Sequence, residues 1–326
     1  MRVLVTGATG FTGGHLARML AGRGYQVRAL VRREDQAAPL RAAGIEPIVG
    51  DLKERRALDQ AVRQVEVVYH IAAIYRQAGL PASEYHAVNV AAVRDLIEAA
   101  AAAGASRVVH CSTVGVHGDV KNPPANEDAP LSPGDVYQRT KVEGEAAARE
   151  ASARTGLAVT IARPSGIYGP GDRRLLRLFR GVARRRFVVL GPGDIFYHLT
   201  YVEDLAEGFR LCGEVAGAAN RTYILAGGEV TTLNELIGLI AEEAGVKPPA
   251  GHWPVWPVWL AGAMCEAACV PLRIEPPLYR RRVDFFTKSR AFDITKARRE
   301  LGYAPGVGLR DGIRRTLAWY RGQGWL

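Results

Sequence analysis

Cysteine is scarce in this sequence, which has four cysteines among 326 residues. Cys111 and Cys212 lie far apart, and Cys265 and Cys269 fall in an apolar stretch without ligand-like histidines. This pattern suits neither a disulfide framework nor a zinc site, so we expect reduced thiols, no metal and a cytosolic protein. The first strand-like run begins at Arg2, so we expect no signal peptide.

A hydrophobic run of bilayer length is also missing. The most apolar stretch, WPVWPVWLAGAMCEAACVPL at residues 253–272, carries one charge, Glu266. We expect a helix to start only after Pro257 and to cover residues 258–270, whereas a span needs about 20 residues. We therefore predict no membrane span. A core-packing helix remains an alternative to our prediction, the wall or mouth of an apolar pocket that also touches the membrane surface.

Negative charge is in deficit, and the formal net charge is +10. The densest basic run is DRRLLRLFRGVARRR, residues 172–186. On a helix, Arg173, Arg177, Arg180 and Arg184 share one face, opposite the apolar side chains. A solvated amphipathic helix, an anionic membrane surface and an acidic ligand all suit this pattern. No nucleic-acid recognition motif accompanies the charge, so we expect no nucleic-acid partner.

What the sequence does contain is a glycine-rich turn near its start. Gly7, Gly10 and Gly13 follow the apolar run at residues 3–5 and precede an amphipathic helix. Glycine lets the backbone turn tightly and approach a pyrophosphate, whose charge is met by N–H groups at the helix start. Between a strand and a helix, this spacing predicts a dinucleotide site.

Buried strands and helices then alternate along the chain. The predicted strands cover residues 27–31, 45–49, 65–71, 108–111 and 159–162, and one intervening helix covers 91–103. This alternation predicts an α/β fold, a doubly wound parallel sheet of the Rossmann type with helices on both faces. The ligand crevice should lie at the carboxyl ends of the strands.

The residues after the second strand bear on the choice of cofactor. An acidic residue there would bind the ribose 2′-hydroxyl of NAD, but the chain has Arg32 and Arg33. Guanidinium groups suit a 2′-phosphate, so the sequence favours NADP(H), with NAD(H) as the alternative. Asp51, after the third strand, is expected to hold the adenine edge.

The candidate chemistry lies in VYQRTK. Tyr137 and Lys141 are four residues apart and so share a helix face, where an ammonium would lower the pKa of the phenol and make it a usable general acid/base. Ser112 and Thr113 stand at the end of a predicted strand, where a hydroxyl could bind a substrate oxygen. An ordinary strand-end turn is the alternative for this pair.

Together these motifs resemble the extended short-chain dehydrogenase/reductase superfamily. The resemblance rests on TGATGFTG, Asp51, HIAA at 70–73, NVAAV, CSTVGVHG, YQRTK and RPSGIYGPGD, and it covers essentially the whole chain. It implies that Tyr137 is the catalytic acid/base and that Lys141 binds the nicotinamide ribose and tunes Tyr137. Thr113 would polarise the substrate, with Ser112 as the substitute, and Asn89 would support the site.

The resemblance also implies a set of cofactor-binding residues. These are Gly7, Thr9, Gly10, Phe11, Thr12, Gly13, Arg32, Asp51, Leu52, Ala72, Ala73, Tyr137, Lys141 and Pro164. One departure is His117, where the superfamily usually has tyrosine, and it bears on local substrate contacts.

Within the superfamily, the residues after Thr113 and the C-terminal third narrow the choice. Sugar-nucleotide dehydratases carry an acidic pair where this chain has Val114 and Gly115, which argues against dehydration. An epimerase remains open. The runs at 276–305 and 309–320 resemble the 3β-hydroxysteroid dehydrogenase branch, including sterol-4α-carboxylate 3-dehydrogenases. VRALVR resembles the dihydroflavonol reductases.

We therefore expect an NAD(P)-dependent oxidoreductase that acts at C3 of a sterol or steroid, including a 4α-carboxysterol that then loses CO₂. The alternatives are a sugar-nucleotide epimerase and a dihydroflavonol-type ketone reductase. Residues 1–170, with a return segment at 194–226, would form the nucleotide domain. Residues 171–193 and 227–326 would form a smaller, interleaved substrate domain. A homodimer and a peripheral contact at the inner face of the membrane are compatible with the sequence.

Overall fold

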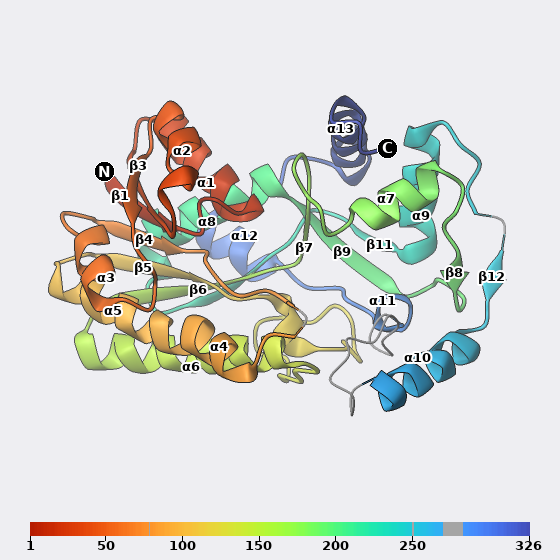
Figure 1. Cartoon of the computed structure of the whole chain (residues 1–326), viewed down its shortest axis with the longest axis horizontal. Helices are drawn as coiled ribbons and strands as arrows, with labels where there is room; N and C mark the ends of the chain where they lie inside the picture. The colour runs from red at the N-terminus through yellow and green to blue at the C-terminus, as the bar shows by residue number, and fades with distance from the viewer. Residues whose placement is uncertain (78, 250, 270–282) are drawn as a thin grey trace.

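The computed structural model describes residues 1–77, 79–249, 251–269 and 283–326. A seven-stranded parallel sheet forms its larger part, in the order β10-β6-β5-β4-β1-β2-β3 (Figure 1). The strands are β1 Arg2–Thr6, β2 Gln26–Val31, β3 Glu46–Val49, β4 Val67–His70, β5 Arg107–Cys111, β6 Ala158–Pro164 and β10 Thr222–Leu225. The order reverses between β1 and β4, where open α/β sheets bind ligands.

Helices cover both faces of this sheet (Figure 1). On one face, α1 (Phe11–Gly22) packs beside α8 (Val202–Glu214) over a core of β1, β2 and β4 side chains. On the other face lie α3 (Arg55–Ala61), α5 (Ala92–Ala102) and α6 (Val136–Thr155), over a second core. The predicted doubly wound fold is confirmed, and the predicted strands match observed ones to within a few residues.

A smaller region lies beside the carboxyl ends of the strands. The strands β7 (Gly166–Tyr168), β9 (Phe196–Tyr201) and β11 (Val230–Thr232) pair in one sheet. A third core joins them to α7 (Leu176–Ala183), α9 (Leu233–Ala244) and α13 (Leu309–Gly322). Between β9 and β11 the chain returns to the large sheet to form α8 and β10.

The basic run folds as α7, a helix shorter than the run itself. Leu178, Phe179 and Val182 are buried in the third core, as an amphipathic pattern requires. Part of its basic face holds the C-terminus, because Arg180 Nε donates to the carbonyl of Trp325 at 2.6 Å. The arginine face is therefore not wholly solvated.

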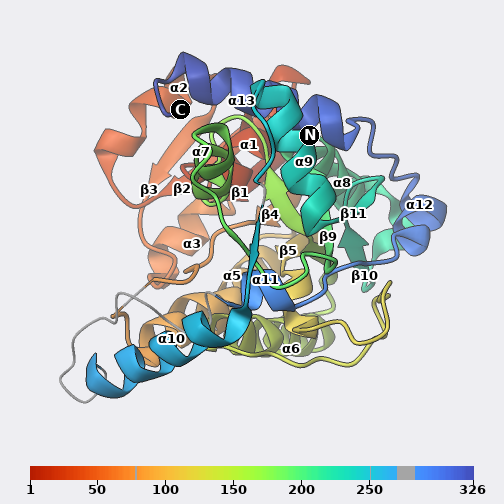
Figure 2. The same cartoon turned by 90° about the vertical axis from the view of Figure 1, so that its right-hand side faces the viewer.

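The tryptophan-rich stretch forms β12 (His252–Trp253) and α10 (Val255–Cys269), which lies at the margin of the molecule (Figure 2). The expectation that a helix could start only after Pro257 is wrong, because a first turn needs no N–H from proline. The core-packing alternative is also wrong, since Gly262 is the one buried residue among those described in α10. Trp253, Trp256 and Trp259 are 62%, 68% and 47% exposed.

No helix in the described residues is long and apolar enough to cross a membrane. Residues 270–272 of the tryptophan-rich stretch and 276–282 of the C-terminal run lie outside the described residues. The remaining helices are α2 (Ala38–Ala42), α4 (Ala82–His86), α11 (Asp284–Thr287) and α12 (Thr295–Leu301), and β8 (Val189–Leu190) pairs with β12.

Candidate active site

The glycine turn packs too tightly for any side chain. A Cβ on Gly13 would lie 2.3 Å from the carbonyl oxygen of Gly7, and one on Gly7 would lie 2.8 Å from the nitrogen of Ala72. Gly7 also has φ +74°, which favours glycine. No side chain caps α1 at Gly10, and its first turn has no acidic residue. The start of α1 therefore suits the pyrophosphate of a dinucleotide.

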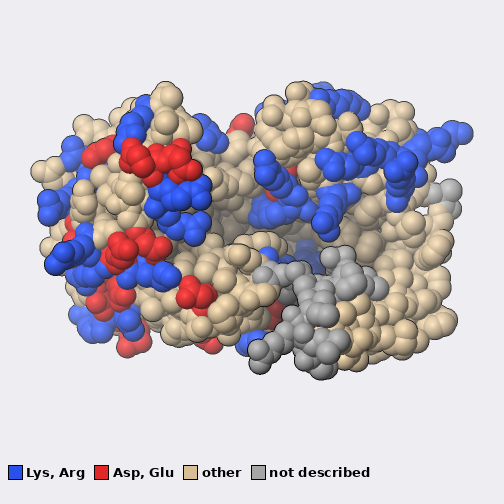
Figure 3. Space-filling model, viewed as in Figure 1, with Lys and Arg blue, Asp and Glu red and all other residues tan. Residues whose placement is uncertain are grey.

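A cleft of about 1110 Å³ runs from this turn into the smaller region, and Figure 3 shows the molecule hollowed there between its two halves. The expected cofactor residues all line it: Gly7, Thr9, Gly10, Phe11, Thr12, Gly13, Arg32, Asp51, Leu52, Ala72, Ala73, Tyr137, Lys141 and Pro164. So do Ser112 and Thr113, whereas Asn89 does not. The structure thus brings together residues that are far apart in sequence.

The two arginines after β2 have different surroundings. Arg33 forms a bidentate pair with Asp35, with two N···O distances of 2.9 Å, and is not among the residues that line the cleft. Arg32 lines the cleft, and no described residue pairs with its guanidinium. Of these two arginines, only Arg32 is therefore placed to contact a cofactor bound in the cleft.

Thr113 and Ser112 follow β5, but their hydroxyls have different partners. Thr113 Oγ1 accepts a hydrogen bond from the Gly115 N–H at 3.0 Å, which leaves its own O–H free to donate into the cleft. Ser112 Oγ donates to Glu145 Oε1 at 2.6 Å within the core. Thr113 is thus the hydroxyl better placed to hold a substrate oxygen.

Tyr137 and Lys141 lie in the first two turns of α6. Asp135 caps this helix by accepting the Gln138 N–H at 2.8 Å, which fixes the backbone just before Tyr137. No described residue hydrogen-bonds to the Tyr137 hydroxyl or the Lys141 ammonium, and both line the cleft. Two polar groups are thus presented together to a ligand.

The expectation of a lowered pKa for Tyr137 is wrong. Burial raises the pKa of Tyr137, and Cys111 and Tyr75 add to the rise, while the guanidinium groups of Arg76 and Arg174 oppose it. Burial also lowers the pKa of Lys141. Desolvation outweighs neighbouring charge, so Tyr137 is a neutral phenol that can donate a proton.

Two residues missed by the sequence reasoning cover Tyr137. The Tyr75 ring meets the Tyr137 ring edge-on, with centroids 4.9 Å apart. The Arg76 guanidinium carbon lies 5.5 Å from the Tyr75 centroid and 5.8 Å from the Tyr137 centroid. Arg76 Nε donates to Asp135 Oδ2 at 2.8 Å. Asp135 could have been found as a helix cap directly before VYQRTK, but nothing in the sequence marks Arg76.

Asn89 holds the loop that carries Tyr75 and Arg76. It occupies a π-turn between α4 and α5, is 1% exposed, and accepts the Ile74 N–H at 2.8 Å. Its Nδ2 donates to the carbonyl of Ile74 and to Thr140 Oγ1 on α6. Asn89 therefore ties the loop that carries Tyr75 to the helix that carries Tyr137.

A buried ion pair supports the end of β5. Arg163 donates from Nε and Nη2 to the two carboxylate oxygens of Glu145, at 2.8 and 2.7 Å. Burial alone would raise the pKa of Glu145, but hydrogen bonds from Arg163 and Ser112 and the charge of Arg163 hold it below its usual value. His117, the departure from the superfamily pattern, lies 3.2 Å from Arg163 Nη1 and is not among the cleft-lining residues.

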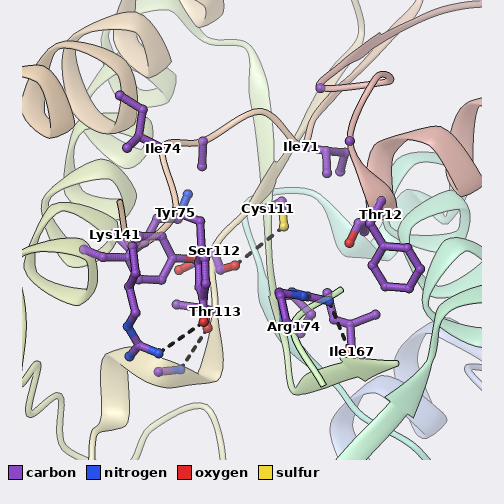
Figure 4. A pocket seen from close by; sticks show the side chains of 18 of the residues that line it. Thr12, Ile71, Ile74, Tyr75, Cys111, Ser112, Thr113, Lys141, Ile167 and Arg174 are labelled. Carbon is purple, nitrogen blue, oxygen red and sulfur yellow. Dashed lines mark hydrogen bonds between the residues drawn. The ribbon is translucent and has the colours of Figure 1, made fainter. Parts of the chain in front are cut away.

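The far half of the cleft is mainly apolar, with cations interspersed. Its apolar lining comprises Leu175, Leu178, Phe187, Leu199, Phe285, Phe286 and Phe292, and its cations are Arg174, Arg177, Lys288 and Arg290. Tyr197, His198 and Asp284 also line it, and Asp284 pairs with Lys288 at 2.8 Å. Figure 4 shows Arg174 and Thr12 across the pocket from Tyr75, Thr113 and Lys141. No described residue of 253–269 lines the cleft, so the prediction that this stretch forms its wall is wrong for the described residues.

Several lining residues come from the C-terminal run, which the sequence flagged only by resemblance. Its segment after α11 is held by Val120 N–H, which donates to the Ser289 carbonyl, and by a bridge between Ala125 and Phe292. These extended, strand-like contacts hold the segment that carries Lys288, Arg290 and Phe292 against the cleft. No local sequence pattern reports such a path.

Comparison with known proteins agrees with this geometry. The chain is 32% identical over 339 residues to sterol demethylase protein B of Methylococcus capsulatus, covering 100% of both chains. It is 31% identical to 2-alkyl-3-oxoalkanoate reductase of Stenotrophomonas maltophilia, covering 98% of this chain and 99% of that one. It is also 31% identical to 3beta-hydroxysteroid-dehydrogenase/decarboxylase isoform 2 of Arabidopsis thaliana, covering 96% of this chain and 61% of the plant protein.

Among solved structures, MoeE5 in complex with UDP-glucose and NAD superposes with a TM-score of 0.78 and 28% identity, covering 99% of each chain. Residues 3–226 match the NAD dependent epimerase/dehydratase family. The chain therefore belongs to the NAD dependent epimerase/dehydratase family, the extended short-chain dehydrogenase/reductase fold expected from its motifs.

Proposed function

We propose that the protein is an NAD(P)-dependent oxidoreductase acting on the C3 hydroxyl or ketone of a sterol or steroid. The observation that carries this proposal is the position of Thr113, Tyr137 and Lys141 in a cleft whose far half is largely apolar. A sterol presents one polar atom at the end of a rigid apolar body, and such a cleft suits that shape. Relatives named for sterol and hydroxysteroid chemistry support the same class.

The residues have distinct roles in this reaction. The bound nicotinamide would supply or accept the hydride. In oxidation, Tyr137 must first release its own proton to solvent. The phenolate oxygen then takes the proton of the substrate hydroxyl as the carbinol hydrogen leaves with its electron pair, which yields a ketone. In reduction, neutral Tyr137 returns that proton to the ketone oxygen. Thr113 holds the oxygen in both directions, and Lys141 holds the ribose.

We further propose a preference for NADP(H) over NAD(H). The support is the free guanidinium of Arg32 in the cleft, beside the expected adenosine ribose. Arg33, which forms an ion pair with Asp35, is the matched control because it is a surface arginine next to Arg32. Direct titration of both cofactors against the two single alanine variants tests the assignment.

A sugar-nucleotide epimerase is the second candidate. The cations of the far half, Arg174, Arg177, Lys288 and Arg290, could bind a substrate pyrophosphate, and a structural neighbour was solved with UDP-glucose. Nicotinamide absorbance with sterols, flavonols and nucleotide sugars separates the candidates. Net cofactor turnover with a sterol supports our proposal, whereas interconversion of nucleotide sugars without net turnover contradicts it.

We also propose that α10 makes a peripheral contact with a membrane surface. The exposed tryptophans of α10 come directly after β12, and β12 pairs with β8. Three exposed arginines, Arg184, Arg185 and Arg186, come shortly before β8 in the chain. Tryptophan and arginine together suit an interface with anionic lipids. The division into residues 1–170 with 194–226, and 171–193 with 227–326, stays our proposal for the domains.

A further inference from the structure

An arginine lies beside Tyr137, although hydride transfer between a carbinol carbon and a nicotinamide needs no cation there. Arg76 lines the cleft, and its guanidinium carbon is 5.8 Å from the Tyr137 ring centroid. Because Arg76 and Tyr137 line the same part of the cleft, a substrate oxygen bonded to Tyr137 would place its neighbouring carbons on the side of the cleft where Arg76 lies. Placed there, a cation can recognise a substituent beside the reacting carbon.

The arginine is held rigidly from both sides of its loop. Asn89 exchanges two hydrogen bonds with the backbone of Ile74, at 2.8 and 3.0 Å. Tyr85 Oη accepts the Gln77 N–H at 2.7 Å and donates to the Gln77 carbonyl at 2.9 Å. Arg76 thus projects from a short loop that is clamped just before and just after it. Preorganisation of this kind lowers the cost of binding a ligand group.

The guanidinium is only partly used by the protein. Its Nε donates to Asp135, and its Nη1 donates to the Tyr75 hydroxyl at 3.2 Å. Among the described residues none accepts a hydrogen bond from Nη2, and the side chain is 32% exposed. Asp135, which is 8% exposed, orients the group and leaves N–H donors for a second anion.

We propose that Arg76 binds a carboxylate carried on the carbon next to the reacting carbon, so that the substrate is a 3-hydroxy or 3-oxo acid. This inference rests on the proposed hydride transfer at Tyr137 but not on a sterol skeleton. Such a carboxylate is two bonds from the carbinol carbon, so it would reach the part of the cleft that Arg76 lines when the carbinol oxygen meets Tyr137. The relatives named as a decarboxylase and as an oxoalkanoate reductase suit the same substituent pattern.

The test compares substrates that differ only in this charge. The probes are 4α-carboxycholestan-3β-ol, its methyl ester and cholestan-3β-ol, with kcat/KM measured from nicotinamide absorbance. We expect the wild-type protein to prefer the acid to the ester by about 10–100-fold, the range for hydrogen bonds to a charged group. Arg76→Met should bring this ratio close to one, and Arg76→Lys should keep part of it.

A ratio is needed because Arg76 also acts on Tyr137. The guanidinium lowers the pKa of that phenol, so its loss should also slow the uncharged ester and alcohol, and a fall in the rate with the acid alone would not report recognition of the carboxylate. Arg139→Met is the matched control, since Arg139 is exposed on α6 and outside the cleft lining. It should keep the wild-type ratio. Melting curves and NAD(P)H titration check that each variant is folded.

Equal use of acid and ester by the wild-type protein overturns the inference even if Arg76→Met fails to fold. A preference that survives Arg76→Met also overturns it. Turnover of cholestan-3β-ol without any acid preference keeps the proposed function and removes the inference. If no sterol is turned over, the proposed function fails. A 2-alkyl-3-hydroxyalkanoate and its methyl ester then replace the probes, and absence of an Arg76-dependent preference in turnover or binding overturns the inference.

Discussion

Replacing Glu145 by glutamine should destabilise the protein strongly while preserving the shape of the side chain. Glu145 is 1% exposed and Arg163 is 3% exposed, and they share two hydrogen bonds of 2.8 and 2.7 Å. The glutamine amide would leave the Arg163 guanidinium buried without a counter-charge. Its NH₂ group would also face an N–H donor of Arg163 in place of a carboxylate oxygen. Breaking a buried pair from one side typically costs about 3–5 kcal/mol of unfolding free energy.

The assay is thermal and urea unfolding at neutral pH, with Glu143→Gln as the control. Glu143 is exposed on the same helix, α6, and its neutralisation should leave unfolding nearly unchanged. For a chain of this size, the expected loss corresponds to a fall in Tm of roughly 5–15 °C. If Glu145→Gln melts together with the control, the ion pair contributes no net stability and the reasoning is refuted.

The pH dependence gives a second check with a definite sign. The pKa of Glu145 in the folded protein is lowered, against burial, by Arg163 and Ser112. Its contribution is therefore present above the pKa of the unfolded chain, about 4.3, and is lost as the pH falls through the folded value. The difference in stability between wild type and Glu145→Gln should be constant from pH 6 to 8, ~2 units above that pKa, and shrink below it.

The other predictions concern the cofactor, the chemistry and α10. Tyr137→Phe should lower turnover by about 10²–10⁴ with little change in cofactor affinity, measured by steady-state kinetics and NAD(P)H titration. Arg32→Ala should weaken NADP(H) by roughly 1.5–3 kcal/mol more than NAD(H), and Arg33→Ala should not; a wild-type preference for NAD(H) refutes this. Replacing Trp256 and Trp259 by serine should reduce sedimentation with vesicles containing phosphatidylglycerol, while Tm stays within 2 °C of wild type, or about 1 kcal/mol at most. Unchanged sedimentation refutes the membrane contact.

Periodicity and glycine spacing were enough to predict the nucleotide half of the fold. Parallel strands buried on both faces appear in the sequence as continuous apolar runs. The close approach of Gly13 to Gly7 excludes any other residue at position 13. Both features can therefore be recognised from short stretches of sequence. The pair of Tyr137 and Lys141 was likewise visible, because a helix places residues four apart on one face. These parts of the site depend on neighbours in sequence.

The residues that were missed depend on contacts over long distances along the chain. Arg76 reaches Tyr137 only because Asn89 and Tyr85 clamp its loop and Asp135 receives its guanidinium. The tryptophan-rich stretch was misread for a related reason. An apolar composition predicts burial, but Gly262 is the one buried residue among those described in α10, and Trp256 is 68% exposed.

The neutral state of Tyr137 joins these observations into one physical argument. Burial raises the pKa of Tyr137 and keeps its proton on, and Arg76 is among the charges that favour the phenolate. A substrate carboxylate bound to Arg76 would screen that cation and make Tyr137 hold its proton still more firmly. Departure of the carboxylate as CO₂ would leave its bonding electron pair on the neighbouring carbon as the enolate of the ketone, and protonation of that enolate would remove the negative charge and reverse this effect. The same guanidinium would then couple recognition of the acid to the proton affinity of Tyr137, the acid/base that we propose.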